Sequence, residues 1–119
     1  MVEVLYTDEF EAWWGTLRTG EQQDVDVVVR LLQEQGVTLG WPYSSAIQGS
    51  RFALRELRVQ SAGHPLRVFY AFDPWRDAVL LIGGDKTGDD RFYDWMIPKA
   101  ETVLVDYLTE ETERRKREK

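Results

Sequence analysis

The chain has no cysteine, a single histidine and no long apolar run among its 119 residues. The lack of cysteine excludes disulfides, thiolate zinc sites and a cysteine nucleophile. The longest apolar run, Ala78 to Ile82, is far shorter than the ~20 residues of a membrane span. Residues 1–11 contain acids but no lysine or arginine, so no signal peptide is expected there. These absences predict a soluble, cytoplasmic protein with no membrane partner.

The apolar content is sufficient for a packed core. Hydrophobic residues make up 43% of the chain and aromatic residues 13%, which excludes disorder for most of it. The length matches one domain, because domains most often have about 100–150 residues. We expect one domain over residues 1–108 and a charged C-terminal tail over 109–119.

The period of the apolar residues predicts an α+β fold. A short strand is followed by two amphipathic helices, and then alternation with a period of two indicates three strands before a last helix. The expected ranges are 2–6 (strand), 8–18 and 21–35 (helices), 52–59, 66–72 and 77–82 (strands) and 94–115 (helix). The order βααβββα predicts a small antiparallel sheet with helices on one face and the other face open.

The net charge of −6 is unevenly distributed along the chain. Residues 1–50 carry two arginines and eight acids, whereas residues 51–70 carry four arginines and one acid. The alternation places Glu56, Arg58 and Arg67 on the same, open face of the sheet. These side chains are either a cross-strand ion pair of little energetic value or an anion-binding surface. If Arg67 is exposed in this way, Arg67→Ala would remove a phosphate contact without removing core volume.

Several segments resemble the HigB branch, also called phage Gp49-like, of the RelE/ParE toxin superfamily. The resemblance covers about residues 4–108 in order and without large gaps. The segments that carry it are FEAWWGTL at 10–17, LLQEQGVTLG at 31–40, WPYSSAIQGSRFALRELR at 41–58, LRVFYAFD at 66–73, VLLIGGDKTG at 79–88 and IPKAETVLVDYL at 97–108. The resemblance implies a RelE-like fold and a ribosome-dependent mRNA endoribonuclease, the toxin component of a type II toxin–antitoxin system.

The resemblance also implies which residues form the site. Its positions correspond here to Glu56, Arg58, Arg67, Lys86 and Tyr93 as catalytic residues, with Arg55 and Arg51 as RNA-binding residues. Metal-free RNA cleavage by the 2′-hydroxyl needs a base, cations near the phosphate and an acid for the leaving oxygen. Glu56 is the candidate base, the arginines suit the phosphate, and Tyr93 or Lys86 could assist the acid step.

No cofactor is expected, and His64, within Gly63-His64-Pro65, is expected to be a surface turn residue. The acids of residues 85–90 lack the alternating ligands of a calcium loop, so no metal site is expected. The implied partners are a helix-turn-helix, HigA-like antitoxin, the ribosome and mRNA, with operator DNA bound through the antitoxin. Two alternatives remain open: a ParE-like toxin without nuclease activity, and a phage-derived binding protein with the same fold.

Overall fold

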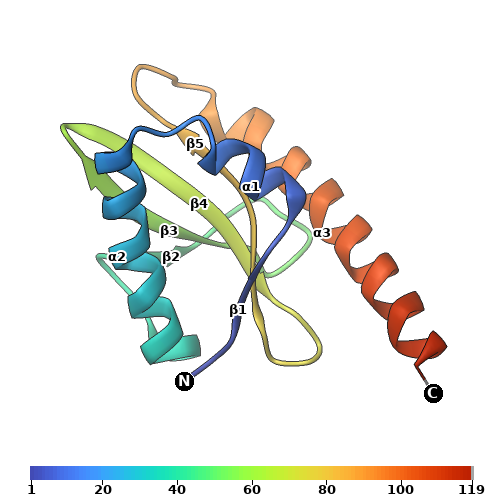
Figure 1. The fold of residues 1–119 in the computed structure, drawn as a ribbon. Helices are drawn as coiled ribbons and strands as arrows, with labels where there is room; N and C mark the ends of the chain where they lie inside the picture. Colours follow the sequence, from blue (N-terminus) through green and yellow to red (C-terminus); the bar gives the residue numbers. More distant parts are fainter. Residues whose placement is uncertain (119) are drawn as a thin grey trace.

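The computed structural model describes residues 1–118, which form three α-helices, a short 3-10 helix and five strands (Figure 1). In chain order these are β1 (Val4–Tyr6), α1 (Asp8–Trp14), α2 (Thr19–Gln35), the 3-10 helix (Gly36–Thr38), β2 (Ser44–Ala46), β3 (Arg55–Ser61), β4 (His64–Phe72), β5 (Ala78–Asp85) and α3 (Phe92–Arg117). The predicted α+β class and the order βααβββα are confirmed, with the short strand β2 as an addition. Within the described residues, no helix is both long and apolar enough to cross a membrane.

The five strands form one sheet in the order β1-β5-β4-β3-β2. The pairs β2–β3, β3–β4 and β4–β5 are antiparallel, whereas β1 pairs parallel with β5. The sheet is therefore mixed, and the prediction of a purely antiparallel sheet was wrong in this respect. The cause is the connection: the chain leaves β1, forms both N-terminal helices and the β2–β4 strands, and returns beside β1 only with β5.

The β3–β4 hairpin has a two-residue turn that fixes its register. Ala62 and Gly63 both have positive φ, 49° and 81°, as a type I′ turn requires. Ser61 pairs with His64 directly across this turn, so both strands extend further toward it than predicted. The same register pairs Arg58 with Arg67 and thereby aligns two of the predicted site residues.

Helices α1 and α2 cover one face of the sheet (Figure 1). Phe10 of α1 and Val25, Val28 and Leu32 of α2 are buried against alternate side chains of the central strands. The strand residues of this cluster are Leu57, Val59, Leu66, Val68, Tyr70, Ala78 and Leu80. This core follows directly from the 3.6-residue period of the helices and the two-residue period of the strands.

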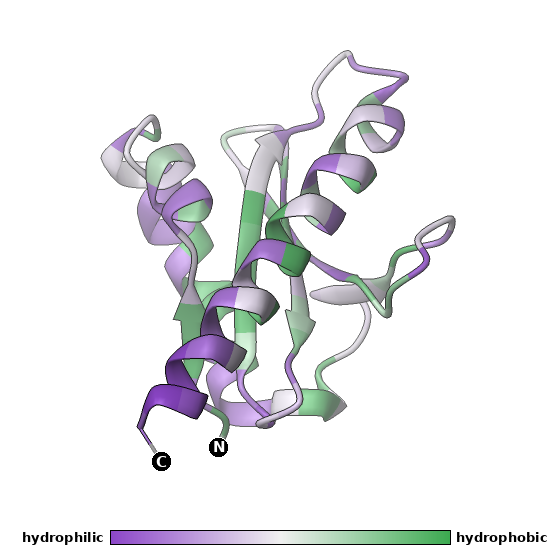
Figure 2. Cartoon of the chain, turned by 90° about the vertical axis from the view of Figure 1, so that its right-hand side faces the viewer, coloured by the Kyte–Doolittle hydropathy of each residue, from purple (hydrophilic) through white to green (hydrophobic). Residues whose placement is uncertain are grey.

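The long helix α3 covers the opposite face, which we expected to be open. Phe92, Met96 and Ala100 of α3 pack on Phe69 and other apolar side chains of that face. Figure 2 shows α3 lying across the strands, with its last turns hydrophilic and its first turns carrying apolar residues. The prediction that all helices lie on one face was therefore wrong. β4 and β5 have apolar residues on both faces, so helices must pack on both faces of the sheet to bury them.

The ends of two helices also differ from the predicted bounds. α1 ends at Trp14 rather than at residue 18, and α3 runs from Phe92 to Arg117, two residues longer at each end than the predicted 94–115. Lys119, the last residue of the expected tail, lies outside the described residues. The division into a domain over 1–108 and a tail over 109–119 stays a prediction.

Candidate functional site

A buried carboxylate, Glu56 on β3, is the centre of the candidate site. Glu56 is 4% exposed. Its Oε1 accepts a hydrogen bond from the Tyr93 hydroxyl at 2.7 Å. Its Oε2 accepts from Ser45 Oγ at 2.9 Å and from Arg58 Nη1 at 3.3 Å. Arg67 Nε lies 3.7 Å from Oε1. Four side chains from β2, β3, β4 and α3 therefore converge on one carboxylate, which we call the Glu56 cluster.

The strand register brings the charged members of the cluster together. Arg58 is directly opposite Arg67, and Glu56 lies two residues before Arg58 on the same face of β3. The predicted grouping of these three side chains is confirmed. Ser45 was missed, because it belongs to β2, a three-residue strand that pairs Ser45 with Glu56 and has too few residues for a detectable period.

Tyr93 closes the cluster from the first turn of α3. Its ring stacks on Phe69 of β4, with the ring centroids 5.9 Å apart and the planes at 23°. Burial, together with the hydrogen bond to Glu56, raises the pKa of Tyr93 above its usual value near 10. The phenol therefore keeps its proton at neutral pH, as a proton donor must.

Lys86 lies at the rim of the same cluster. It follows β5 in the loop that leads to α3, and its Nζ lies 5.1 Å from the centroid of the Tyr93 ring. Five of the predicted site residues, namely Glu56, Arg58, Arg67, Lys86 and Tyr93, are thus brought together. They come from β3, β4, the loop after β5 and the first turn of α3.

Arg67 differs from the exposed cation that its strand position predicted. Its side chain is 5% exposed because the start of α3 covers this part of the sheet. Nη1 donates to the Leu66 carbonyl at 3.0 Å, whereas Nε is buried and has no hydrogen-bond partner among the described residues. The expectation that Arg67→Ala would remove no core volume was therefore wrong. In this arrangement Arg67 acts on the cluster through its charge.

Arg58 is the more accessible cation of the cluster. Its side chain is 25% exposed, and the ring of Trp41 covers its guanidinium, with Cζ 4.3 Å from the ring centroid. A guanidinium at this position can donate two parallel hydrogen bonds to a phosphate. Arg58 and Lys86 are therefore the two cations best placed to meet an anionic ligand.

Arg55 and Arg51 do not join the cluster. Arg55 points to the opposite face, where its Nε donates to Ser44 Oγ at 3.2 Å and to the Tyr70 hydroxyl at 3.3 Å. Arg51 is 70% exposed, with its Nε 3.8 Å from a carboxylate oxygen of Glu101 on α3. The alternation along β3 explains the first position, since adjacent strand residues face opposite sides. The structure thus places the two predicted RNA-binding arginines outside the cluster.

The single histidine of the chain lies in an exposed position beside the β3–β4 turn. His64 is exposed at the start of β4, with its Nδ1 3.1 Å from Thr87 Oγ1 and 3.3 Å from an Asp85 oxygen. Across residues 1–118, no three histidine, aspartate or glutamate side chains are grouped as metal ligands. The Glu56 cluster and its rim supply a carboxylate, a phenol, a hydroxyl, two guanidinium groups and an amine.

Comparisons with known proteins identify the family of the chain. The family model described as phage-derived Gp49-like protein (DUF891) matches residues 12–105. HigB3 of Mycobacterium tuberculosis, whose name marks it as a candidate toxin, is 37% identical over 110 residues, which cover 91% of this chain and 95% of that protein.

A second relative, HigB2 of the same organism, carries a similar name. It is 33% identical over 119 residues, covering 94% of this chain but only 59% of HigB2. No solved structure matches the chain. The match to the family model covers most of the chain, and HigB3 is 37% identical to it over nearly the whole length of both proteins. The chain therefore belongs to the phage-derived Gp49-like family and is a HigB-like member of it.

Proposed function

We propose that the protein is the toxin of a type II toxin–antitoxin pair and acts as a ribosome-dependent mRNA endoribonuclease. The observation that carries the proposal is the Glu56 cluster, in which a carboxylate, a protonated phenol and two arginines share one site. Phosphodiester cleavage by the adjacent 2′-hydroxyl needs these group types. The names of the two Mycobacterium tuberculosis relatives support the toxin assignment.

The proposed reaction uses the RNA itself as the nucleophile. The 2′-oxygen forms a bond to phosphorus while the bond to the 5′-oxygen breaks, which yields a cyclic 2′,3′-phosphate and a free 5′-hydroxyl. Glu56 accepts the proton of the 2′-hydroxyl, and the Tyr93 hydroxyl donates a proton to the leaving 5′-oxygen. The hydrogen bond of 2.7 Å between Tyr93 and Glu56 Oε1 then allows the proton to return to the phenol. Arg58 and Lys86 offset the charge that develops on the phosphate oxygens.

The burial of Glu56 supports a requirement for the ribosome. Each oxygen of Glu56 is already engaged by neighbouring side chains, so a substrate hydroxyl must displace one of them. The chain as a whole is acidic, with a net charge of −6, and lacks the excess of cations that binds free RNA tightly. A message already held and bent by the ribosome would bring its hydroxyl into position without that binding energy.

Primer extension on one transcript tests the reaction. The transcript is supplied free and in a programmed ribosome complex, with chelator in both, and we expect cleavage only on the ribosome. Tyr93→Phe keeps the stacked ring, and we expect its single-turnover rate to fall about 10²- to 10⁴-fold through loss of the acid. Equal cleavage of the free transcript would contradict the ribosome requirement. Loss of cleavage with chelator would contradict the metal-free mechanism.

Expression in cells separates the enzyme from the two alternatives. We propose that the protein stops growth when produced without its partner, and that a helix-turn-helix antitoxin relieves this and joins the toxin to operator DNA. Growth arrest without mRNA cleavage would favour a ParE-like toxin that is not a nuclease. Normal growth with verified protein would favour a phage-derived binding protein instead.

A further inference from the structure

Trp41 is a large aromatic side chain that is open to solvent directly beside the Glu56 cluster. It is 71% exposed, the largest exposed fraction among the tryptophans of the chain. One side of its ring lies over the guanidinium of Arg58, with Cζ 4.3 Å from the ring centroid. The cation–π contact fixes one face of the indole and leaves the other available.

Backbone hydrogen bonds hold Trp41 in this place. The amides of Tyr43 and Ser44 both donate to the carbonyl of Gly40, at 3.1 and 3.0 Å, and so close a turn around Trp41. The amide of Arg58 donates to the carbonyl of Tyr43 at 2.8 Å, which ties this turn to β3. The ring is therefore positioned before any ligand arrives, and a ligand need not bear the cost of ordering it.

The order of groups across the surface matches the parts of a nucleotide. Arg58 lies between Trp41 and Glu56: its guanidinium is under the indole, and its Nη1 is 3.3 Å from Glu56 Oε2. A phosphate bound by Arg58 would be next to the carboxylate on one side and the aromatic ring on the other. The base attached to that phosphate through its sugar would then reach the free face of Trp41.

We propose that Trp41 is the platform on which one nucleobase of the RNA substrate stacks while Arg58 binds the adjoining phosphate. This inference rests on the proposed function, because it identifies how the same site holds its substrate. Every base has an aromatic face, so the contact favours single-stranded RNA without selecting a sequence. Trp41 is thus a substrate-positioning residue that takes no part in proton transfer.

A short single-stranded RNA with 2′-O-methyl sugars tests the contact without cleavage. Each tryptophan gives one indole N–H resonance, so NMR titration reports on Trp41 separately, and Trp41→Ala assigns its signal. We expect the Trp41 resonance to shift on binding, and Trp41→Ala to weaken binding about 5- to 150-fold, the range for loss of one stacked base. Trp41→Phe retains a ring and should lose less.

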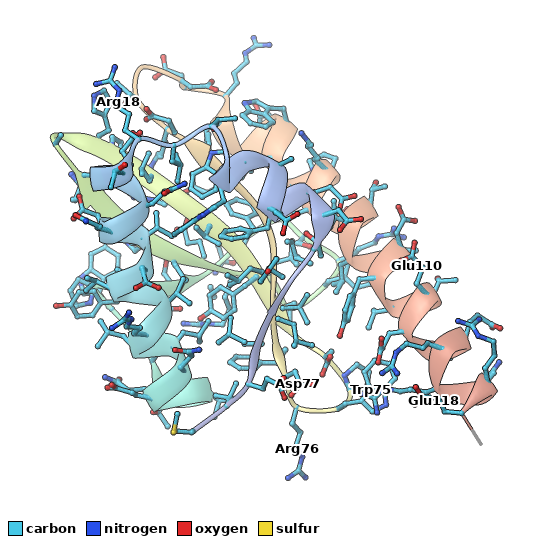
Figure 3. The ribbon with its side chains drawn as sticks, viewed as in Figure 1. Arg18, Trp75, Arg76, Asp77, Glu110 and Glu118 are labelled. Carbon is cyan, nitrogen blue, oxygen red and sulfur yellow. The ribbon has the colours of Figure 1, made fainter. Side chains whose placement is uncertain are left out.

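Trp75 provides a matched control. Its ring also lies over an arginine, with Arg115 Cζ 4.2 Å from the ring centroid, but in the turn between β4 and β5. Figure 3 shows Trp75 beside Glu118, at the C-terminal end of α3 and away from the start of that helix. We expect Trp75→Ala to bind the oligonucleotide as the wild type does. An equal loss in both variants would overturn the proposal.

Removal of the base from the RNA separates stacking from phosphate binding. An oligonucleotide with an abasic site at the stacked position should bind the wild-type protein as weakly as the intact RNA binds Trp41→Ala. The two losses should not add in Trp41→Ala with the abasic RNA, because both remove the same contact. Additive losses, or no shift of the Trp41 resonance, would overturn the stacking proposal. If the protein binds RNA through Trp41 but does not cleave mRNA on the ribosome, the proposed function is contradicted and the stacking proposal still holds.

Discussion

Arg67 and Arg58 flank the same carboxylate but differ in their access to solvent. The Arg67 side chain is 5% exposed and lies 3.7 Å from Glu56 Oε1, whereas Arg58 is 25% exposed and lies 3.3 Å from Oε2. Removing one partner of a buried ion pair leaves a charge without compensation, which is far more costly than loss of a solvated pair. The two arginines are therefore expected to contribute differently to folding and to function.

We expect Arg67→Ala to lower the free energy of unfolding by about 3–5 kcal/mol, because Glu56 then stays buried beside a single arginine. Arg58→Ala should lower the free energy of unfolding by only about 1 kcal/mol, because its partly exposed ion pair is closer to a surface pair. The same variant removes the guanidinium that we propose binds phosphate. Urea unfolding of both variants measures the difference. Addition of Glu56→Gln should restore part of the stability of Arg67→Ala, because the amide carries no charge. Equal losses in the two single variants would contradict this assignment.

Tyr93 makes the stability of the protein depend on pH in the alkaline range. Its pKa is raised in the folded protein, chiefly by burial and next by the hydrogen bond to Glu56. The folded state therefore holds the phenolic proton more tightly than the unfolded chain, whose tyrosines titrate near pH 10. The resulting stabilisation is complete below about pH 10 and is lost as the pH rises through the folded-state pKa.

From pH 8 to about pH 10, the free energies of unfolding of wild type and Tyr93→Phe should differ by a constant amount. Above about pH 10 the wild type should lose stability relative to Tyr93→Phe. Urea unfolding at each pH provides the measurement. Tyr107, whose pKa is also raised by burial and by its contact with Asp73, is present in both proteins and so cancels in the comparison. A difference that does not vary up to pH 11 would show that Tyr93 titrates as a free phenol.

At the scale of elements, the contact between α1 and β5 depends on the absence of a side chain at Gly83. A Cβ built at Gly83 would lie 2.2 Å from Cε3 of Trp13, so the indole of α1 rests directly on the backbone of β5. In this position Trp13 also packs against the apolar core that α1 and α2 form with the sheet. Gly84 is packed as closely against α3, since a Cβ there would lie 2.9 Å from Cε1 of Phe92.

Gly83→Ala is expected to lower the free energy of unfolding by about 1–3 kcal/mol, the usual cost of overpacking. Gly20→Ala is the matched substitution: it lies within α2, no atom lies within 4 Å of its Cβ, and its backbone is helical. It should raise stability by about 0.5–1 kcal/mol through helix propensity. Thermal unfolding of both variants tests this pair. Stabilisation by Gly83→Ala would mean that Trp13 does not rest on β5.

At the scale of the whole molecule, negative charge surrounds a small cationic site. The chain carries 21 acidic and 15 basic residues, and the accessible cations at the Glu56 cluster are Arg58 and Lys86. Acids of α1 and α3 line a hollow beside Tyr6 on the β1 edge of the sheet. This distribution favours RNA that is held by another macromolecule. Free RNA would meet a mostly negative surface.

Salt dependence measures how many phosphates the site neutralises. With contacts from Arg58 and Lys86 alone, the logarithm of the association constant for single-stranded RNA should fall with the logarithm of salt concentration with a slope of about −1.4. Titration of an uncleavable RNA at several salt concentrations gives this slope. A slope steeper than about −3 would require more than four phosphate contacts and would contradict the small cationic site.

The sequence by itself determined the local features of this protein. The periods of its apolar residues predicted the order of helices and strands, because each period reflects the geometry of one element. Alternation along β3 and β4 placed Glu56, Arg58 and Arg67 on one face, since side-chain direction in a strand needs only two-residue counting. The family resemblance added Lys86 and Tyr93 as candidates.

Only the tertiary structure decided what surrounds those side chains. The pattern within a strand cannot say which helix covers which face, so it left Arg67 exposed on an open sheet, whereas α3 buries it. Ser45 and Trp41 reach the Glu56 cluster through β2 and the turn before it, which are too short to have a period of their own. Burial and contact arise between segments far apart in the chain, and these set the strength of the Glu56 charge pairs and the access of a ligand to them.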